Sequence, residues 1–125
     1  AGHAYERKLA AELRDIGFPD CVTSRSESRR RDDQGVDFCY TGPLNIQAKR
    51  WKSAPSYHDT LASMPDEPGQ INAIFHKRPH KGDVVVLSKS DFLEIVETLL
   101  RERIWKHATN PKSQLPPNES EIRND

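Results

Sequence analysis

The 125-residue chain lacks most of the features that mark a special class of protein. Its two cysteines, Cys21 and Cys39, stand in no CxxC pair, which argues against a zinc site; we expect small core residues on or beside strands. No run approaches the ~18 apolar residues of a membrane helix. The first residues lack the charged-then-apolar layout of a signal peptide. We therefore expect a cytoplasmic protein, cellular or virus-encoded, with no membrane partner.

The chain also lacks a net charge, because 19 basic residues balance 19 acidic ones. Taken alone, this argues weakly against nucleic-acid binding, which usually shows a basic excess. The distribution is more informative. Basic residues cluster in segments 25–31, 49–52 and 77–81, whereas acidic residues concentrate in 94–125. A neutral total can therefore hide one basic face.

The chain does have the length of one domain. Hydrophobic residues make up 34% and charged residues 30%, which allows one modest core. Because a small core leaves a thin margin of stability, a dimer is plausible. We expect the domain to occupy residues 1–107. Residues 108–125 are rich in Pro, Asn, Ser and Glu, which predicts a C-terminal tail or arm.

The pattern of apolar residues predicts a mixed α/β domain. Helices are expected at 5–16, 57–63 and 91–105, the last with Ser90 as N-cap, and strands at 21–23, 36–40, 44–51, 71–76 and 84–87. Residues 24–35 are polar, Arg-rich and aperiodic, which predicts a mobile loop, and 41–43 would join two strands into a hairpin. The expected architecture is a small central mixed β-sheet flanked by helices.

The predicted hairpin carries the residues with the clearest chemistry. Gln47 and Lys49 are two apart on a strand, so both side chains point to the same polar face, opposite the apolar face of Ile46 and Ala48. Asp37 lies on the paired strand, within reach across the hairpin. A carboxylate, an amide oxygen and an ammonium group would therefore converge on one spot.

This combination suits the hydrolysis of a phosphodiester bond. Mg²⁺ prefers oxygen ligands and keeps several waters; Asp37 can supply a charged oxygen and Gln47 a neutral one. The metal would lower the pKa of a bound water and neutralise charge on the phosphate. Lys49 can orient that water or stabilise the pentavalent oxyanion. The alternative for so short a pattern is a solvated hairpin face.

Asp37 followed by Gln47-Ala48-Lys49 resembles the D-(E/Q)-x-K signature of the restriction-endonuclease-like, PD-(D/E)XK nucleases. The likeness is closest to archaeal-type Holliday junction resolvases and covers residues 3–100 in order. The other features of that likeness are Glu6-Arg7 in the first helix, Gly17-Phe18 at its end, the basic segment 24–31, the apolar strand 84–87 and Asp91-Phe92-Leu93. The resemblance implies a restriction-endonuclease-like fold and a DNA endonuclease.

The resemblance also implies a role for each site residue. Asp37 would be the main metal ligand, Lys49 the catalytic lysine, and Glu6 a metal or water-shell ligand from the first helix. The backbone carbonyl of Ala48 would be a further ligand. Gln47 takes the place usually held by Glu, which removes one negative charge and should lower the affinity for Mg²⁺. The implied cofactor is Mg²⁺, with Mn²⁺ expected to substitute.

The implied partner is DNA, either a four-way junction or another branched form, bound by a homodimer with two active sites. Salt-sensitive phosphate contacts are expected from the basic clusters. The candidate DNA-binding residues are Arg7, Ser24, Arg25, Arg29, Arg30, Arg31, Arg50, Lys52, Lys77, Arg78 and Lys81. Trp51 could stack on a base, or belong to the core or to a dimer surface.

Three other functions stay open on the sequence. The first is a PD-(D/E)XK nuclease with a restriction, repair or nicking role, since likeness of fold does not fix the substrate. The second is a non-catalytic DNA-structure-binding protein that has lost metal affinity. The third is a protein-interaction domain whose charged faces are only solvated.

Overall fold

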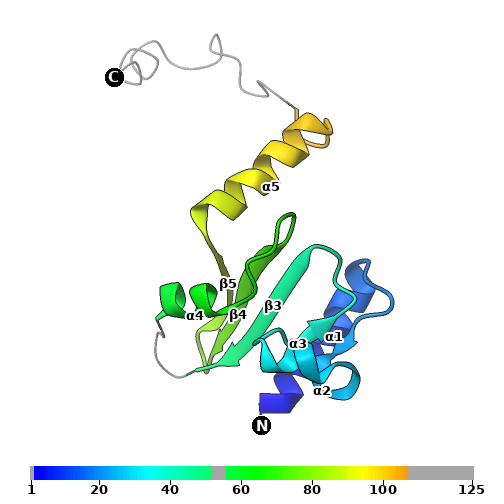
Figure 1. The fold of residues 1–125 in the computed structure, drawn as a ribbon, viewed down its shortest axis with the longest axis vertical. Coiled ribbons are helices and arrows are strands. Elements are labelled where there is room, and N and C mark those ends of the chain that lie inside the picture. The colour runs from blue at the N-terminus through cyan, green and yellow to red at the C-terminus, as the bar shows by residue number, and fades with distance from the viewer. Residues whose placement is uncertain (1, 52–55, 107–125) are drawn as a thin grey trace. The chain divides into compact units, whose positions relative to one another are not determined.

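The structure is a computed structural model that describes residues 2–51 and 56–106 (Figure 1). The chain divides into two compact units, Ala1–Asp91 and Phe92–Asp125. This division lies earlier than the domain boundary predicted at residue 107, and the predicted tail, 108–125, falls outside the described residues. Within 2–51 and 56–106, no helix combines the length and the apolar character needed to cross a membrane.

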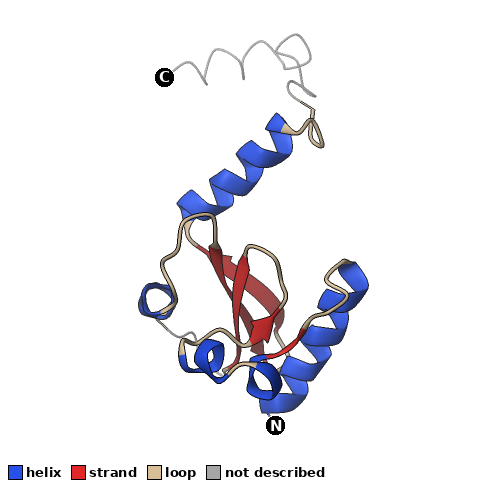
Figure 2. Ribbon diagram, turned by 45° about the vertical axis from the view of Figure 1, so that its right-hand side comes forward, coloured by secondary structure: helices blue, strands red, loops and turns tan. Residues whose placement is uncertain are grey.

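A three-stranded mixed sheet lies at the centre of the first unit. Strand β3 (Leu44–Arg50) pairs in parallel with β4 (Ile71–Arg78), and β4 pairs antiparallel with β5 (Gly82–Leu87). The chain is therefore a mixed α/β protein, as predicted. The two later strands are longer than expected, because Lys77 and Arg78 continue the ladder opposite Asp83 and Gly82. Figure 2 shows helices on both sides of this sheet.

The main core lies between the sheet and helix α1 (Gly2–Ile16), which begins three residues before its predicted start. Tyr5, Leu9 and Leu13 recur every four residues, so they form one stripe along the helix. All three are buried in one cluster with Ile46 and Ala48 of β3. The predicted apolar face of β3 is therefore confirmed as its core face.

Helix α4 (Tyr57–Ser63) lies by β4 on the other side of the sheet from α1 and matches its prediction (Figure 1). The Ser56 side chain caps it by accepting a hydrogen bond from the Asp59 backbone N–H. The polar face of β3 is less exposed than its composition suggests. Asn45 is buried, and its amide donates to Gln70 Oε1 at 2.8 Å and to Asn72 Oδ1 at 3.1 Å.

The segment predicted as a loop over 24–35 is helical instead. It forms α2 (Ser24–Glu27) and α3 (Arg29–Asp33). The Ser28 side chain accepts a hydrogen bond from Arg31 N and caps α3, while the Arg31 side chain donates twice to the Phe38 carbonyl. These polar contacts fix the segment without an apolar stripe. For that reason, a search for hydrophobic periodicity missed both helices.

The predicted hairpin of 36–40 with 44–51 is also corrected. Strand β2 (Phe38–Cys39) forms its ladder with β1 (Val22–Thr23), antiparallel, rather than with β3. One backbone hydrogen bond, from Asp37 N to Ile46 O at 2.8 Å, still joins the two segments. Tyr40, at φ 65°, turns the chain away directly after β2. Cys21 and Cys39 are buried free thiols, in agreement with the predicted core role.

Helix α5 (Lys89–Arg101) starts and stops earlier than predicted. Its N-cap is Ser88 rather than Ser90, since Ser88 Oγ accepts a hydrogen bond from Asp91 N at 3.1 Å. The helix ends at Arg101 rather than at Trp105, and Arg103 takes a positive φ of 60°. In β5, the predicted buried strand is about half exposed at Val84 and Val85.

Candidate active site

Asp37 is held at the edge of β3 by hydrogen bonds on three of its groups. Its backbone N–H donates to Ile46 O and its carbonyl accepts from Ser24 N, both at 2.8 Å. Its carboxylate Oδ2 accepts from the backbone N–H of Ala48 at 2.7 Å. The residue lies between α3 and β2, and the neighbouring strand fixes both its backbone and its side chain. Asp37 is therefore brought beside the Gln47-Ala48-Lys49 segment, as the sequence predicted.

The surroundings of Asp37 disfavour its charge. Burial raises the pKa of this carboxyl to about 6, and the negative charges of Glu6 and Asp32 add to the effect. The Ala48 N–H and the Lys49 ammonium group act in the opposite direction but do not offset it. A cation bound beside Asp37 would stabilise its negative charge. Asp32, in α3, is an acidic neighbour that the residue pattern did not predict.

The Gln47 amide lies directly against the backbone of Gly35. A Cβ added to Gly35 would approach Gln47 Nε2 to 2.9 Å, and Gly35 also takes a positive φ of 74°. Only glycine suits this position. Among the described residues, the Gln47 Oε1 atom is buried and has no hydrogen-bond partner. A buried amide oxygen of this kind needs a donor or a cation.

Lys49 is positioned by an aromatic side chain from its own strand end. Its Nζ atom lies 5.5 Å from the centre of the Trp51 ring, within the range of a cation–π contact. The parallel register places His76 of β4 beside Lys49. Because paired residues in a sheet share a face, the Lys49 and His76 side chains emerge on the same side.

His76 is the residue that sequence reasoning missed. The sequence placed it at the end of the predicted strand 71–76 without a role, yet it is a buried residue inside β4 with 1% exposure. The Tyr57 hydroxyl lies 2.7 Å from Nδ1, and the Trp51 carbonyl lies 3.3 Å from Nε2. Since a carbonyl only accepts, Nε2 donates to the Trp51 carbonyl, while Nδ1 shares a hydrogen bond with the Tyr57 hydroxyl. The rings of Trp51 and His76 also meet edge to face at 5.3 Å. The only sequence signal was the apolar run before His76.

Glu6 lies on α1 close enough to raise the pKa of Asp37. Its carboxylate Oε1 accepts from Arg25 Nε at 3.1 Å, so α1 and α2 are joined by an ion pair. The Glu6 side chain is 16% exposed and that of Arg25 34%. Arg25 is exposed, but its guanidinium is already paired with the Glu6 carboxylate, so it is not a free phosphate contact.

The predicted phosphate contacts of segment 24–31 divide into two kinds. Arg29 and Arg30 are exposed on α3, and Arg29 makes only a long 3.9 Å contact to Asp33. Arg31 turns inward to the Phe38 carbonyl. Ser24 is fully buried, which leaves no surface of this side chain for a phosphate.

A second basic group lies where β3 and β4 end. Arg50 pairs in register with Lys77, and Arg78 and Lys81 follow at the turn into β5. Lys77 Nζ lies 5.7 Å from the centre of the Tyr5 ring, while Arg50, Arg78 and Lys81 are exposed. Lys52 lies outside the described residues. Arg7 is exposed on α1, where it lines a shallow hollow.

The donor groups around Asp37 fit a Mg²⁺ ion only with the help of neutral oxygens. Among residues 2–51 and 56–106, no group of three or more His, Cys, Asp or Glu side chains is arranged to hold a metal ion. The remaining oxygens are the unpartnered Oε1 of Gln47 and the carbonyl of Ala48. That carbonyl faces the Asp37 edge because the N–H of the same strand residue does. Hard oxygen donors of this type suit Mg²⁺ or Mn²⁺.

Comparison with known proteins gives no relative for this chain. No protein-family model, no curated protein and no solved structure matches it. Its function is therefore argued from the site itself.

Proposed function

We propose that this chain is a Mg²⁺-dependent DNA endonuclease of the restriction-endonuclease-like, PD-(D/E)XK type, acting in the cytoplasm on branched DNA such as a Holliday junction. One observation carries the proposal: the Asp37 carboxylate is bonded to the backbone of Ala48, between Gln47 and Lys49. This places a carboxylate, an amide oxygen and an ammonium group around one strand edge. The homodimer implied by the resemblance belongs to the same proposal.

Each site residue has a distinct part in this proposal. Asp37, the Gln47 amide oxygen and the Ala48 carbonyl would hold the metal, with Glu6 acting directly or through water. Mg²⁺ bound there would activate water and neutralise phosphate charge. Lys49 would stabilise the developing oxyanion, held in place by the Trp51 ring. The exposed Arg29, Arg30, Arg50, Arg78 and Lys81 would bind phosphates.

A non-catalytic DNA-structure binder is the second candidate, and one observation favours it. The Glu6 carboxylate is already paired with Arg25, and Gln47 carries no charge. Of these three residues, only Asp37 has a negative charge that is not paired with a basic side chain. Such a site would hold a divalent ion weakly. The basic residues would still bind DNA by the same electrostatic attraction.

A cleavage and binding assay on three substrates separates these functions. The wild-type chain is mixed with a labelled four-way junction, a linear duplex and a single strand, with Mg²⁺, Mn²⁺ or EDTA. We expect paired cuts near the junction in either metal and none in EDTA. Junction binding without cleavage in both metals would favour the non-catalytic binder. The absence of any gel shift at low salt would exclude both DNA functions.

A further inference from the structure

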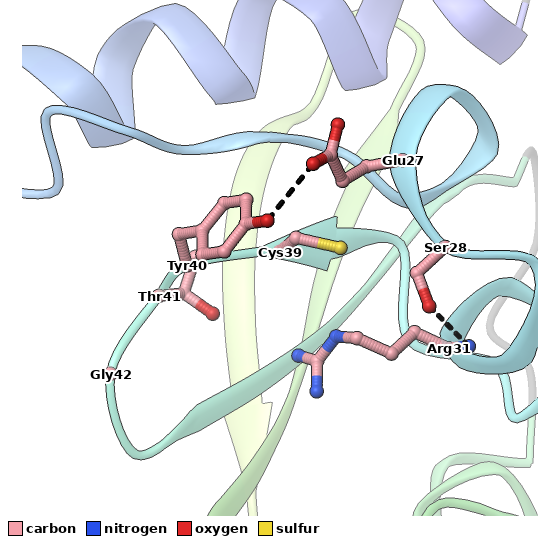
Figure 3. Close-up of a pocket in the computed structure, with 7 residues that line it drawn as sticks. All are labelled: Glu27, Ser28, Arg31, Cys39, Tyr40, Thr41 and Gly42. Atoms are coloured by element: carbon pink, nitrogen blue, oxygen red, sulfur yellow. Dashed lines mark hydrogen bonds between the residues drawn. The ribbon is translucent and has the colours of Figure 1, made fainter.

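A hollow of about 320 Å³ lies between the short helices α2 and α3 and the turn that follows β2. Figure 3 shows its lining: Glu27 and Tyr40 lie on one side, and the Arg31 side chain extends below Cys39 on the other. Its volume is within the range of small-ligand pockets. None of these side chains has a part in the proposed metal site, although Tyr40 follows Asp37 by only three residues.

Tyr40 is the unusual residue of this hollow. A bulky residue at φ 65° is strained, and such strain often marks functional positions. The side chain is 56% exposed, so its ring is available to a ligand. The Tyr40 hydroxyl donates to Glu27 Oε1 at 2.9 Å and thereby fixes the ring. The Glu27 carboxylate also raises the pKa of Tyr40, which keeps the phenol protonated.

Arg31 and Glu27 present opposite hydrogen-bonding groups to the same hollow. The Arg31 guanidinium uses Nε and Nη2 to bond the Phe38 carbonyl at 3.1 and 2.9 Å, and this fixes its plane. Among the described residues, its other N–H donors have no acceptor. Glu27 has a second carboxylate oxygen beyond the one that Tyr40 uses. A ligand must therefore supply acceptors toward Arg31 and donors toward Glu27, beside an aromatic ring.

We propose that this hollow binds an unpaired guanine base of the DNA substrate. Guanine offers the O6 and N7 acceptors that arginine recognises and, on the adjoining edge, N–H donors suited to a carboxylate. Stacking on an exposed tyrosine is the usual means of holding an unpaired base. A phosphate fits less well, because the Glu27 carboxylate would repel it. The inference rests on the proposed DNA function, and it gives the site a base preference beside the cleavage centre.

Binding measured in EDTA tests this preference independently of cleavage. We compare a short all-thymine strand with the same strand carrying one central guanine, by fluorescence anisotropy. The wild-type chain should bind the guanine strand about tenfold more tightly, the size of one good bidentate contact. Inosine, which lacks the exocyclic amine, should lose part of this gain. Equal affinity for the guanine and thymine strands would overturn the inference while leaving the cleavage proposal intact.

Two variants locate the preference in the hollow. Glu27→Gln keeps an acceptor for Tyr40 but removes the charge, and it should abolish the guanine preference; Glu97→Gln, the matched change in an exposed α5 ion pair, should leave it unchanged. Tyr40→Gly removes the ring and relieves the backbone strain, so preference should be lost without a fall in melting temperature. A preference retained in both hollow variants would contradict the assignment.

Free dGMP distinguishes a base within a strand from a mononucleotide. We expect dGMP to bind at least about tenfold more weakly than the guanine strand, because a free nucleotide lacks the phosphate contacts to the basic residues. Equal affinities would contradict a site for strand guanine and would indicate a nucleotide pocket instead.

Discussion

The negative charge of the Asp37 carboxylate is disfavoured by the residues around it. A buried carboxylate close to two other acids is stable only when a hydrogen bond or a cation compensates it. The Ala48 N–H supplies part of that compensation, yet burial still raises the pKa of Asp37 to about 6. The metal proposal follows from this deficit, since the site stabilises charge less well than a purely structural aspartate would require.

Asp37→Asn should therefore stabilise the fold at high pH. The folded pKa lies above the ordinary value of 3.8, so stability is fully present below pH 4 and declines as the pH rises through 6. At pH 8 we expect the variant to be more stable than wild type by about 3 kcal/mol, the free energy of a rise in pKa from 3.8 to about 6, and at pH 3.5 about equal. Urea unfolding at both pH values measures this. A variant less stable at pH 8 would contradict the assigned burial of charge.

The same variant should abolish DNA cleavage while sparing DNA binding. Asparagine keeps an oxygen for the Ala48 N–H, so the local backbone should stay in place. Loss of binding together with cleavage would indicate misfolding or a wrong assignment of Asp37.

Gln47→Glu should increase the affinity of the site for metal. A second carboxylate would replace a neutral oxygen that is buried without a partner. We expect the Mg²⁺ concentration for half-maximal cleavage to fall by about tenfold, equal to ~1.4 kcal/mol. Gln70→Glu, a change in an amide bonded to Asn45, is the matched control and should leave it unchanged. If Gln47→Glu needs as much metal as wild type, Gln47 does not contact the ion.

At the scale of elements, α4 and β4 together support β3, the strand that carries the candidate site. Tyr57 of α4 bonds His76 of β4, His76 reaches the Trp51 carbonyl, and the Trp51 ring lies by the Lys49 ammonium group. Each contact acts through the next one, so Tyr57 and His76 are positioning residues for Lys49. This chain of contacts explains why the ring of His76 is buried at the polar face of the sheet.

Tyr57→Phe should lower kcat and leave KM nearly unchanged. The change removes the hydrogen bond to His76, costs about 1 kcal/mol of stability, and loosens the support of Lys49 without touching DNA. Steady-state cleavage kinetics provide the measurement. Thr98→Val is the control, because it removes a hydroxyl that bonds the Glu94 carbonyl within α5 and not His76. A change confined to KM would argue against a positioning role.

Helix α3 should supply the phosphate contacts of segment 24–31 through two of its three arginines. Arg29 and Arg30 are exposed, whereas Arg31 bonds the Phe38 carbonyl. The double variant Arg29→Ala/Arg30→Ala should reduce the slope of log K against log salt by about 2. Binding titrations at salt concentrations from about 50 to about 200 mM measure this slope. Arg101→Ala on α5 is the control, and an unchanged slope in the double variant would remove α3 from the interface.

The sequence predicted the elements that carry apolar periodicity and missed those that do not. Helix α1 and the alternation along β3 were recognised from residue spacing. Helices α2 and α3 were missed because polar contacts of Ser28 and Arg31 hold them. The predicted pairing of β2 with β3 was wrong because Tyr40, with its left-handed backbone conformation, redirects the chain after β2. No rule of composition predicts that conformation. His76 was missed because its role depends on a parallel register.

At the scale of the whole molecule, the zero net charge conceals two local clusters of basic residues. Exposed arginines lie on α3, and the second basic group lies where β3 and β4 end, next to the Lys49 end of the candidate site. A neutral protein of this kind should depend on local rather than overall attraction to DNA. We therefore expect the proposed DNA binding and cleavage to be separable, since most of the basic residues do not contact the proposed metal donors.

The most direct test of the central claim is the single-turnover rate of junction cleavage in Mg²⁺ by wild type and Lys49→Met. Methionine keeps much of the side-chain length beside Trp51 but removes the charge. We predict a rate at least about 100-fold lower in the variant, the usual effect of removing an oxyanion-stabilising group, with junction affinity within about threefold of wild type and an unchanged melting temperature. Equal cleavage rates, or metal-independent cleavage by wild type, would contradict the assignment of this site.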